Sequence, residues 1–215
     1  MRRLLCAVLL WIGCASLATA GTVRTFEHEF EAKDLRSLAL DVPVGEIDVR
    51  GVDEPRVSVE VRVQCDRGDD DCRDAAEDVE LVSRERGAEL RLDFDGVDGL
   101  GDHEMSLDVE LRVPLTMALD VDLAVGDLHV DGLNRDVRVE VGVGQVKVRM
   151  KEELVGSVDL EVGVGEATMG PDPRRRSRSR SRRFDLGEDV RWDEGTGEAR
   201  IRIDVGVGGI DVRLR

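Results

Sequence analysis

A phrase of about fourteen residues recurs five times along this chain, and a glycine closes the first half of each copy. Around that glycine, valine and leucine alternate with polar residues, which is the two-residue period of a half-buried strand. Glycine accepts a positive φ at a turn without strain. The phrase therefore predicts short strands that meet at a glycine corner and stack on one another. The glycines that align are Gly45, Gly126, Gly144, Gly165 and Gly208.

The later copies follow one another at spacings of 18, 21 and 43 residues. A period near twenty residues with two strands per unit is typical of a β-solenoid or β-roll. The longest spacing is about twice the number of residues in a normal coil, which indicates either a degenerate coil or a long excursion between the last two copies. Only 3% of the residues are aromatic, so the core is built of thin valine and leucine layers. We expect an all-β fold, a repetitive β-solenoid-like or β-roll-like stack of short strands with glycine corners.

Alternation outside the copies predicts further strands. In the first of these, Phe26, His28 and Phe30 share one face. Pro114 ends the last one, because proline cannot donate a ladder hydrogen bond. One or two helical turns are expected at 73–78, and residues 95–102 form a loop. The remaining predicted strands cover residues 56–63, 79–82, 89–94 and 105–113.

The first twenty residues have the pattern of an export signal. Two arginines precede the apolar run Leu4–Ile12, which is too short to span a bilayer. Ala18-Thr19-Ala20 fits a cleavage site, so we expect a signal peptide at 1–20 and a single β domain at 21–215. Lipidation at Cys14 is the alternative, which Trp11 disfavours. The protein is expected to be exported, to the periplasm or the cell surface.

Two cysteines remain after such a cleavage, Cys65 and Cys72 in the stretch CDRGDDDC. A close pair in an oxidising compartment predicts a disulfide, which contributes on the order of 2–3 kcal/mol. The three aspartates between the cysteines form a solvated turn in this interpretation, with a cation contact as the alternative. No metal site is expected here, because soft ligands are too few.

The net charge of −16 disfavours binding to nucleic acid. A basic run interrupts this acidic chain at residues 174–183, inside a flexible loop expected at about 171–185. It has no interleaved aromatic residues for base stacking, so nucleic acid is not an expected partner. A solvated loop, docking onto an anionic envelope surface and pairing with the chain's own acids remain open. The run contains Arg174, Arg175, Arg176, Arg178, Arg180, Arg182 and Arg183.

An acid stands four residues before every corner glycine. Stacked copies place these carboxylates about 4.8 Å apart, and like charges at that spacing are destabilising. Water, salt and nearby arginines can screen them. Alternatively, the stripe binds divalent cations or a basic ligand, or pairs with the arginine run. The five candidate residues are Asp41, Asp122, Glu140, Glu161 and Asp204.

Two residues further back in four copies, the sign of the charge alternates along the sequence. If consecutive copies are neighbours, opposite charges lie side by side and fix the register of the strands. We interpret this second row as structural. Its members are Asp120, Arg138, Asp159 and Arg202.

Motifs of catalysis are missing from the sequence. There is no G-x-S-x-G, no metal-spaced histidine pair and no phosphate loop. The histidines His28, His103 and His129 are each isolated, so a solvent-facing side chain is expected for each. We therefore predict no catalytic residues, no metal and no cofactor.

The phrases VGVGxV and VGDLxV, together with VELRVP before the later copies, resemble the bacterial putative-adhesin or toastrack family. The resemblance covers roughly residues 35–215. It implies an all-β repetitive domain of unknown function in exported and envelope proteins, and it supplies no catalytic residues. The arginine run is a departure from the family's pattern.

These observations favour an exported envelope scaffold that acts as a binding, adhesion or envelope-sensing module without catalysis. The expected partner is an unidentified envelope protein or surface ligand. One alternative is an enzyme acting on polysaccharide, by analogy of fold alone. Against it, Trp192 is the only tryptophan after the signal, and sugar clefts need stacking rings. The other alternative is self-assembly through open strand edges, since the C-terminal IDVRLR has no polar cap.

Overall fold

The computed structural model describes residues 21–97, 105–170 and 187–215. The predicted signal peptide and arginine run lie outside these residues. Within the described ranges the chain is all-β, with one short α-helix and one 3₁₀ turn, and no helix there is long and apolar enough to cross a membrane. The elements are β1 (Gly21–Glu31), β2 (Ser37–Val52), β3 (Arg56–Cys65), α1 (Asp70–Ala76), β4 (Glu80–Arg86), β5 (Glu89–Asp95), β6 (Met105–Pro114), β7 (Ala118–Asp131), β8 (Val137–Met150), η1 (Glu152–Leu154), β9 (Val155–Gly170), β10 (Glu188–Trp192) and β11 (Ala199–Leu214).

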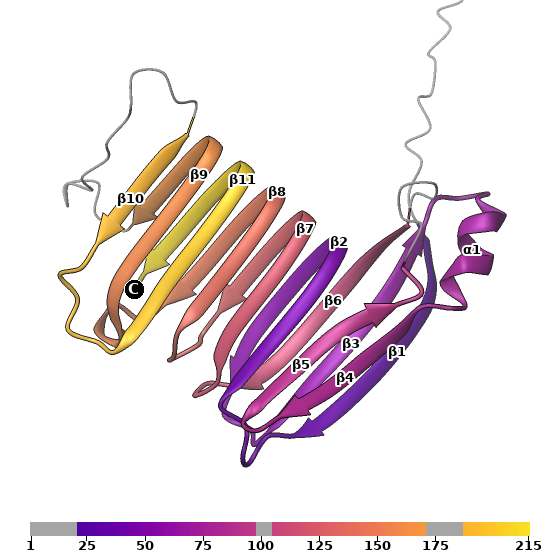
Figure 1. Ribbon diagram of the computed structural model, residues 1–215, viewed down its shortest axis with the longest axis horizontal. Coiled ribbons are helices and arrows are strands. Elements are labelled where there is room, and N and C mark those ends of the chain that lie inside the picture. The colour runs from indigo at the N-terminus through magenta and orange to yellow at the C-terminus, as the bar shows by residue number, and fades with distance from the viewer. Residues whose placement is uncertain (1–20, 98–104, 171–186) are drawn as a thin grey trace, which may run out of the picture.

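All five copies of the phrase form long strands that bend at their corner glycine. Each bent strand pairs in parallel with its neighbours both before and after the corner. The result is a row of arches whose first legs make one layer and whose second legs make another (Figure 1). The apolar rows of both layers face each other and are buried, for example Val121 and Leu128 in the two legs of β7. The glycine corners expected from the sequence are confirmed.

The arches do not follow one another in sequence order. β11, the last strand, lies between β8 and β9 and pairs with both in parallel (Figure 1). A solenoid in which each copy stacks on the preceding one is therefore not what the chain adopts. The expectation of an open edge at the C-terminal strand is also wrong, because β11 pairs along its length with β8 on one side and β9 on the other. The copies share one apolar pattern, so pairing rules alone permit more than one order.

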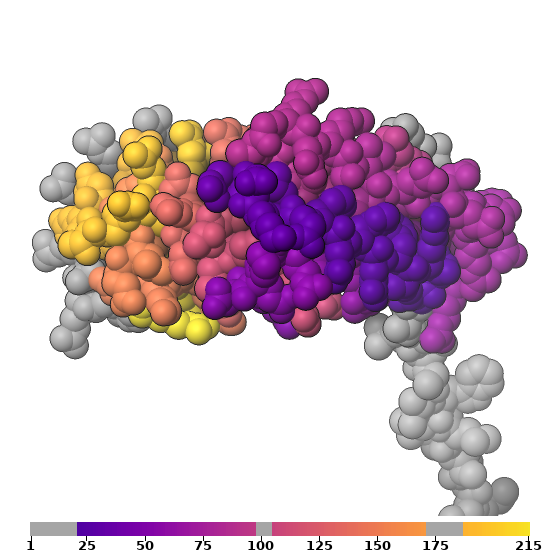
Figure 2. Space-filling model, turned by 90° about the horizontal axis from the view of Figure 1, so that it is seen from below, coloured from indigo at the N-terminus to yellow at the C-terminus, as the bar shows by residue number. Residues whose placement is uncertain are grey.

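The N-terminal end widens the two layers with ordinary strands. β5 pairs with the first leg of β2, and β6 pairs with its second leg. β4 extends the first layer, while β3 and β1 extend the second, all three antiparallel. The strands predicted outside the copies are thus confirmed, and the last one ends at Pro114 as expected. The molecule is elongated, with these strands at one end and β9 and β10 at the other (Figure 2).

The cysteine pair lies beside the short helix. Cys65 and Cys72 form the predicted disulfide, which joins the end of β3 to α1. The helix begins three residues earlier than the sequence indicated, because the side chain of Asp69 accepts a hydrogen bond from the backbone N–H of Cys72 at 2.9 Å. The aspartates expected in a solvated turn therefore occupy the first turn of a helix, where negative charge is favourable.

The corner glycines stand in a ladder that leaves no room for a side chain. Their φ angles lie between +141° and +155°, a region that other residues rarely adopt. A Cβ added to Gly126 would lie 1.7 Å from the carbonyl oxygen of Gly45, and one added to Gly144 would lie 1.6 Å from that of Gly126. The backbones of neighbouring arches therefore approach as closely as they do only because each corner is glycine.

We predict that Gly126→Ala destabilises the protein by at least about 2 kcal/mol, since it combines a strained backbone with a backbone clash. Thermal unfolding followed by circular dichroism measures the effect. Gly170→Ala is the matched control, because a Cβ there meets no atom within 4 Å. A Gly126→Ala variant as stable as the control would contradict the role of the ladder.

Candidate binding surface

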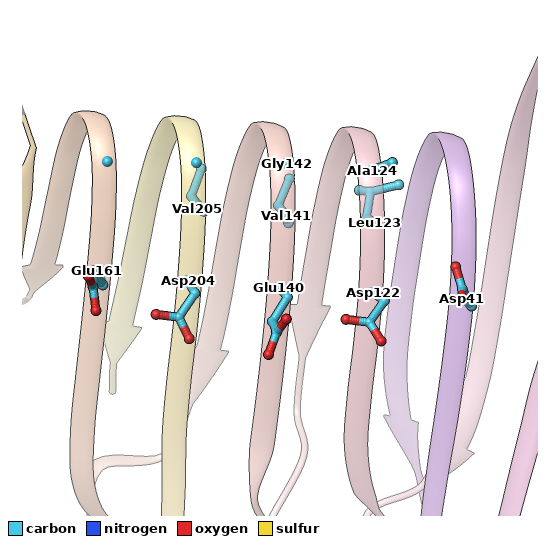
Figure 3. A pocket seen from close by; sticks show the side chains of 12 residues that line it. Asp41, Asp122, Leu123, Ala124, Glu140, Val141, Gly142, Glu161, Asp204 and Val205 are labelled. Atoms are coloured by element: carbon cyan, nitrogen blue, oxygen red, sulfur yellow. The ribbon is translucent and has the colours of Figure 1, made fainter. Parts of the chain in front are cut away.

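The five predicted acids lie side by side on the first legs of the arches. Strand register pairs Asp41 with Asp122, Asp122 with Glu140, Glu140 with Asp204 and Asp204 with Glu161. Figure 3 shows these carboxylates as one row across the face of the sheet. We call them the acid row. The alignment of the copies predicted its members, although their spatial order follows the inserted β11.

Two acids that the repeat did not reveal lengthen this row. At one end Asp189 of β10 pairs with Glu161. At the other end Asp93 of β5 follows Leu92, which pairs with Leu40, and its charge acts on Asp41. Neither β5 nor β10 is a copy of the phrase, so their positions depend on the tertiary fold. The row therefore crosses seven strands.

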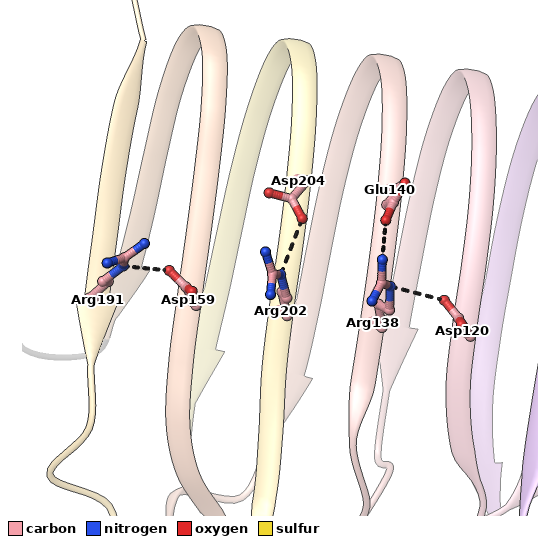
Figure 4. A network of polar contacts seen from close by, with 7 residues as sticks. All are labelled: Asp120, Arg138, Glu140, Asp159, Arg191, Arg202 and Asp204. Atoms are coloured by element: carbon pink, nitrogen blue, oxygen red, sulfur yellow. Dashed lines mark hydrogen bonds and ion pairs between the residues drawn. The ribbon is translucent and has the colours of Figure 1, made fainter.

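The second charged row does not alternate in space as expected. Because β11 is inserted, Arg202 lies directly beside Arg138 on one side and beside Asp159 on the other. Each of these arginines turns toward the acid row on its own strand, Arg138 to Glu140 and Arg202 to Asp204, the latter at 3.4 Å (Figure 4). The row therefore has one like-charge pair across strands, and its two arginines also neutralise acids along their own strands.

Two cross-strand ion pairs complete this network. Arg138 also contacts Asp120 at 3.7 Å, and Arg191 of β10 contacts Asp159 at 2.9 Å (Figure 4). The hydrogen bond to Asp159 raises the pKa of Arg191, and that to Glu140 raises the pKa of Arg138. These pairs are exposed to solvent, so each contributes little to the stability of the fold.

The acids differ in whether an arginine reaches them. Glu140, Asp204 and Asp93 form ion pairs with arginines. Among the described residues, Asp41 and Asp122 have no such partner. Partial burial raises the pKa of the Asp41 carboxyl, and the charges of Asp93 and Asp122 raise it further, against a smaller opposite effect of Arg91. Part of the row thus retains uncompensated negative charge.

A ridge of exposed valines runs beside the acid row, one residue before each corner glycine. Val125, Val143, Val207 and Val164 are 44–48% exposed, and register makes them direct neighbours in that order. They are the exposed large apolar residues of the described chain. The half-buried Val44 continues the line on β2. We call these five residues the valine ridge.

A shallow depression of about 550 Å³ separates the acid row from the valine ridge. The acids line one side of the depression, and small residues line it beside them (Figure 3). A Cβ added to Gly142 would lie 2.5 Å from the carbonyl oxygen of Ala124, so these positions also hold the neighbouring backbones close. None of the residues that line the depression is aromatic. The small residues are Ala124, Gly142, Gly163 and Gly206.

The sequence did not indicate the valine ridge, and the reason is geometric. Strict alternation gives Val143 the same side as the buried Val141. The chain turns at the glycine corner, however, and this turn carries Val143 outward. The signal that was available is its recurrence, since a valine precedes the corner glycine in every copy.

The histidines occupy three different situations. His28 lies between the rings of Phe26 and Phe30 on β1 and is exposed, as expected. His103 lies outside the described residues. His129 is not isolated: its Nδ1 atom lies 3.8 Å from Glu46 Oε1 and 3.9 Å from Asp48 Oδ1, on the second legs of β2 and β7. The partners are far apart in sequence, and only the register of two parallel strands brings them together.

Comparison with known families agrees with this architecture. The family described as "N-terminal domain of toast_rack, DUF2154" matches residues 19–170. The match covers more than half of the chain, which therefore belongs to this family. The resemblance to the toastrack family inferred from the repeated phrases is confirmed. No curated protein matches the chain in sequence.

Solved structures are similar to this chain at low sequence identity. A putative cell adhesion protein from Clostridium sporogenes has a TM-score of 0.50 at 12% identity, over 89% of this chain and 100% of that chain. A putative adhesin from Bacteroides fragilis has a TM-score of 0.36 at 11% identity, over 88% and 97%. A putative lipid binding protein from Parabacteroides distasonis has a TM-score of 0.25 at 9% identity, over 89% and 97%. The first of these likenesses shows a common fold.

We predict that Asp41→Asn stabilises the protein at pH 7 by about 0.2–1 kcal/mol, the range for cross-strand charge pairs. Its raised pKa means that the ionised carboxylate costs free energy in the folded state. The gain should disappear below the ordinary pKa of 3.8, where the carboxyl is protonated in both states. Urea unfolding at several pH values measures the difference.

Glu140→Gln is the control for that measurement. It removes a carboxylate that has an arginine partner, so no stabilisation is expected. An equal gain in both variants would show that the overall charge of the row matters and the local environment of Asp41 does not.

Proposed function

We propose that this chain is an exported, non-catalytic binding module of the cell envelope, and that it binds partners on the surface formed by the acid row, the depression and the valine ridge. The observation that carries the proposal is the ridge. Four half-exposed valines, register partners on neighbouring strands, form an apolar line on an otherwise charged face, and folding alone does not require it. Contiguous exposed apolar surface marks interaction sites.

The surface selects a ligand that is both basic and apolar. Its acids without arginine partners attract cations, while the ridge, three residues further along each strand, offers apolar contact. The net charge of −16 adds long-range attraction for a basic partner. A purely basic ligand would leave the ridge exposed, and a purely apolar one would desolvate the carboxylates without compensation.

The spacing of the arches favours a helical segment of a partner polypeptide. Neighbouring arches are about 4.8 Å apart, so the five corners span about 19 Å. An α-helix advances about 5.4 Å per turn, and about 13 residues cover that length. One face of such a helix repeats almost in step with the arches, whereas side chains on one face of an extended strand repeat every 6.6 Å or so. We therefore commit to a cationic, amphipathic helix as the occupant.

Two alternatives receive less support. Polysaccharide enzymes need stacking rings, but the depression has no aromatic lining and Trp192 is buried, with 9% exposure. Self-assembly remains a prediction, but its expected edge has changed, because β11 is interior and the outer strand at this end is β10.

The export part of the proposal rests on the sequence pattern of residues 1–20. The structurally similar protein from Clostridium sporogenes is named a putative cell adhesion protein, which agrees with a binding role.

We predict that the full chain binds a fluorescent helical peptide of about 18 residues with lysine on one face and leucine on the other. Asp122→Asn with Glu161→Gln, and separately Val143→Thr with Val207→Thr, should each weaken binding at least about tenfold, because each removes one half of the recognition. Fluorescence anisotropy at physiological salt measures the affinity.

The controls separate recognition from charge and from folding. A peptide with glutamate in place of lysine should not bind, and a scrambled peptide of the same composition should bind more weakly. The valine variants should unfold at the wild-type temperature, because these side chains are half exposed. Failure of the lysine peptide to bind, or equal binding by the valine variants, would refute the proposal.

A further inference from the structure

A second cluster lies on the opposite layer, away from the acid row. Glu46 and Asp48 stand two residues apart on the second leg of β2 and therefore face the same way. Asp48 is the direct register partner of His129 on the second leg of β7. Carboxylate and imidazole atoms of the three residues all lie within 4.8 Å of one another.

Neighbouring groups do not satisfy these three side chains. The distances of 3.8 and 3.9 Å from the imidazole to the two carboxylates are too long for hydrogen bonds. The other acids nearby already have partners, since Glu110 accepts from Arg62 and Asp127 accepts from the backbone N–H of Gln145. Within the described chain, Glu46 and Asp48 form no ion pair other than with His129.

We propose that Glu46, Asp48 and His129 bind one divalent transition-metal ion of the zinc class. A tetrahedral ion with bonds of about 2.1 Å holds its ligand atoms about 3.4 Å apart. The imidazole and each carboxylate therefore need to approach by about half an ångström, and the two carboxylates, which lie within 4.8 Å of each other, by at most about 1.4 Å. One nitrogen and two carboxylate oxygens form a donor set that zinc accepts, with water completing the coordination. Calcium and magnesium prefer oxygen alone, and the imidazole therefore sets the selectivity.

The fold prepares this site at little cost. Both strands are held in parallel register along their whole second legs, so the Cβ atoms of the ligands are fixed. All three side chains are partly exposed, so an ion can enter from solvent. Two neighbouring cations oppose binding, Lys147, which pairs with His129 from β8, and Arg50, two residues beyond Asp48 on β2. Both are exposed, so their long side chains can turn into solvent.

The test is calorimetric titration of zinc chloride into the full chain after treatment with EDTA and its removal. The expected result is one saturable site, with binding at least about tenfold weaker in His129→Asn and in Asp48→Asn. The matched control His28→Asn should bind as the wild type does, because His28 has phenylalanine neighbours and no paired carboxylates. Zinc should also raise the unfolding temperature of the wild type but not that of His129→Asn.

Other arms of the experiment exclude general attraction of cations to an acidic surface. Calcium at the same concentration should give no saturable heat, and Asp122→Asn with Glu161→Gln, on the acid row, should leave zinc binding unchanged. Folding of His129→Asn is checked by its thermal transition without metal, and Glu46→Gln serves as a second ligand variant. Zinc binding that survives in all three ligand variants, or that calcium reproduces, would overturn the proposal.

Discussion

The close approach of neighbouring backbones at the glycine corners is the constraint on which the rest of this structure depends. Each corner carbonyl occupies the space that a Cβ of the next corner would need. Parallel pairing continues through the bend for this reason, and the same strand contributes to both layers. In-register corners then dictate in-register rows of acids, small residues and valines. The surface chemistry is thus a consequence of backbone packing that only glycine permits.

The charged rows show how a repetitive sheet tolerates side chains of like charge. Arginines two residues behind Glu140 and Asp204 fold along their own strands onto these acids, so neutralisation does not require an opposite charge on the adjacent strand. This arrangement is insensitive to the order of the arches. It leaves charge unbalanced where a strand lacks the arginine, as in β2, which has Ala39 at that position. Uncompensated charge therefore marks particular strands of the row.

Sequence reasoning recovered the features that depend on short-range pattern. Alternation located the strands, and the recurring glycines located the corners and the acids beside them. Sequence reasoning failed for the features that depend on which strands pair with each other. The position of β11, the register pairing of Arg138 with Arg202 and the grouping of His129 with Glu46 all arise from pairing between distant segments. The valine ridge was missed because a two-residue period does not hold through a corner.

The insertion of β11 between β8 and β9 has a consequence for the order of assembly. During synthesis, β8 and β9 emerge well before β11, yet neither can pair with its final neighbour on that side until residues 199–214 have been made. Until then, the edges of β8 and β9 that will face β11 carry backbone N–H and C=O groups without these final partners. β11 then closes the sheet from within, so residues 199–214 provide the missing pairing partner of both β8 and β9.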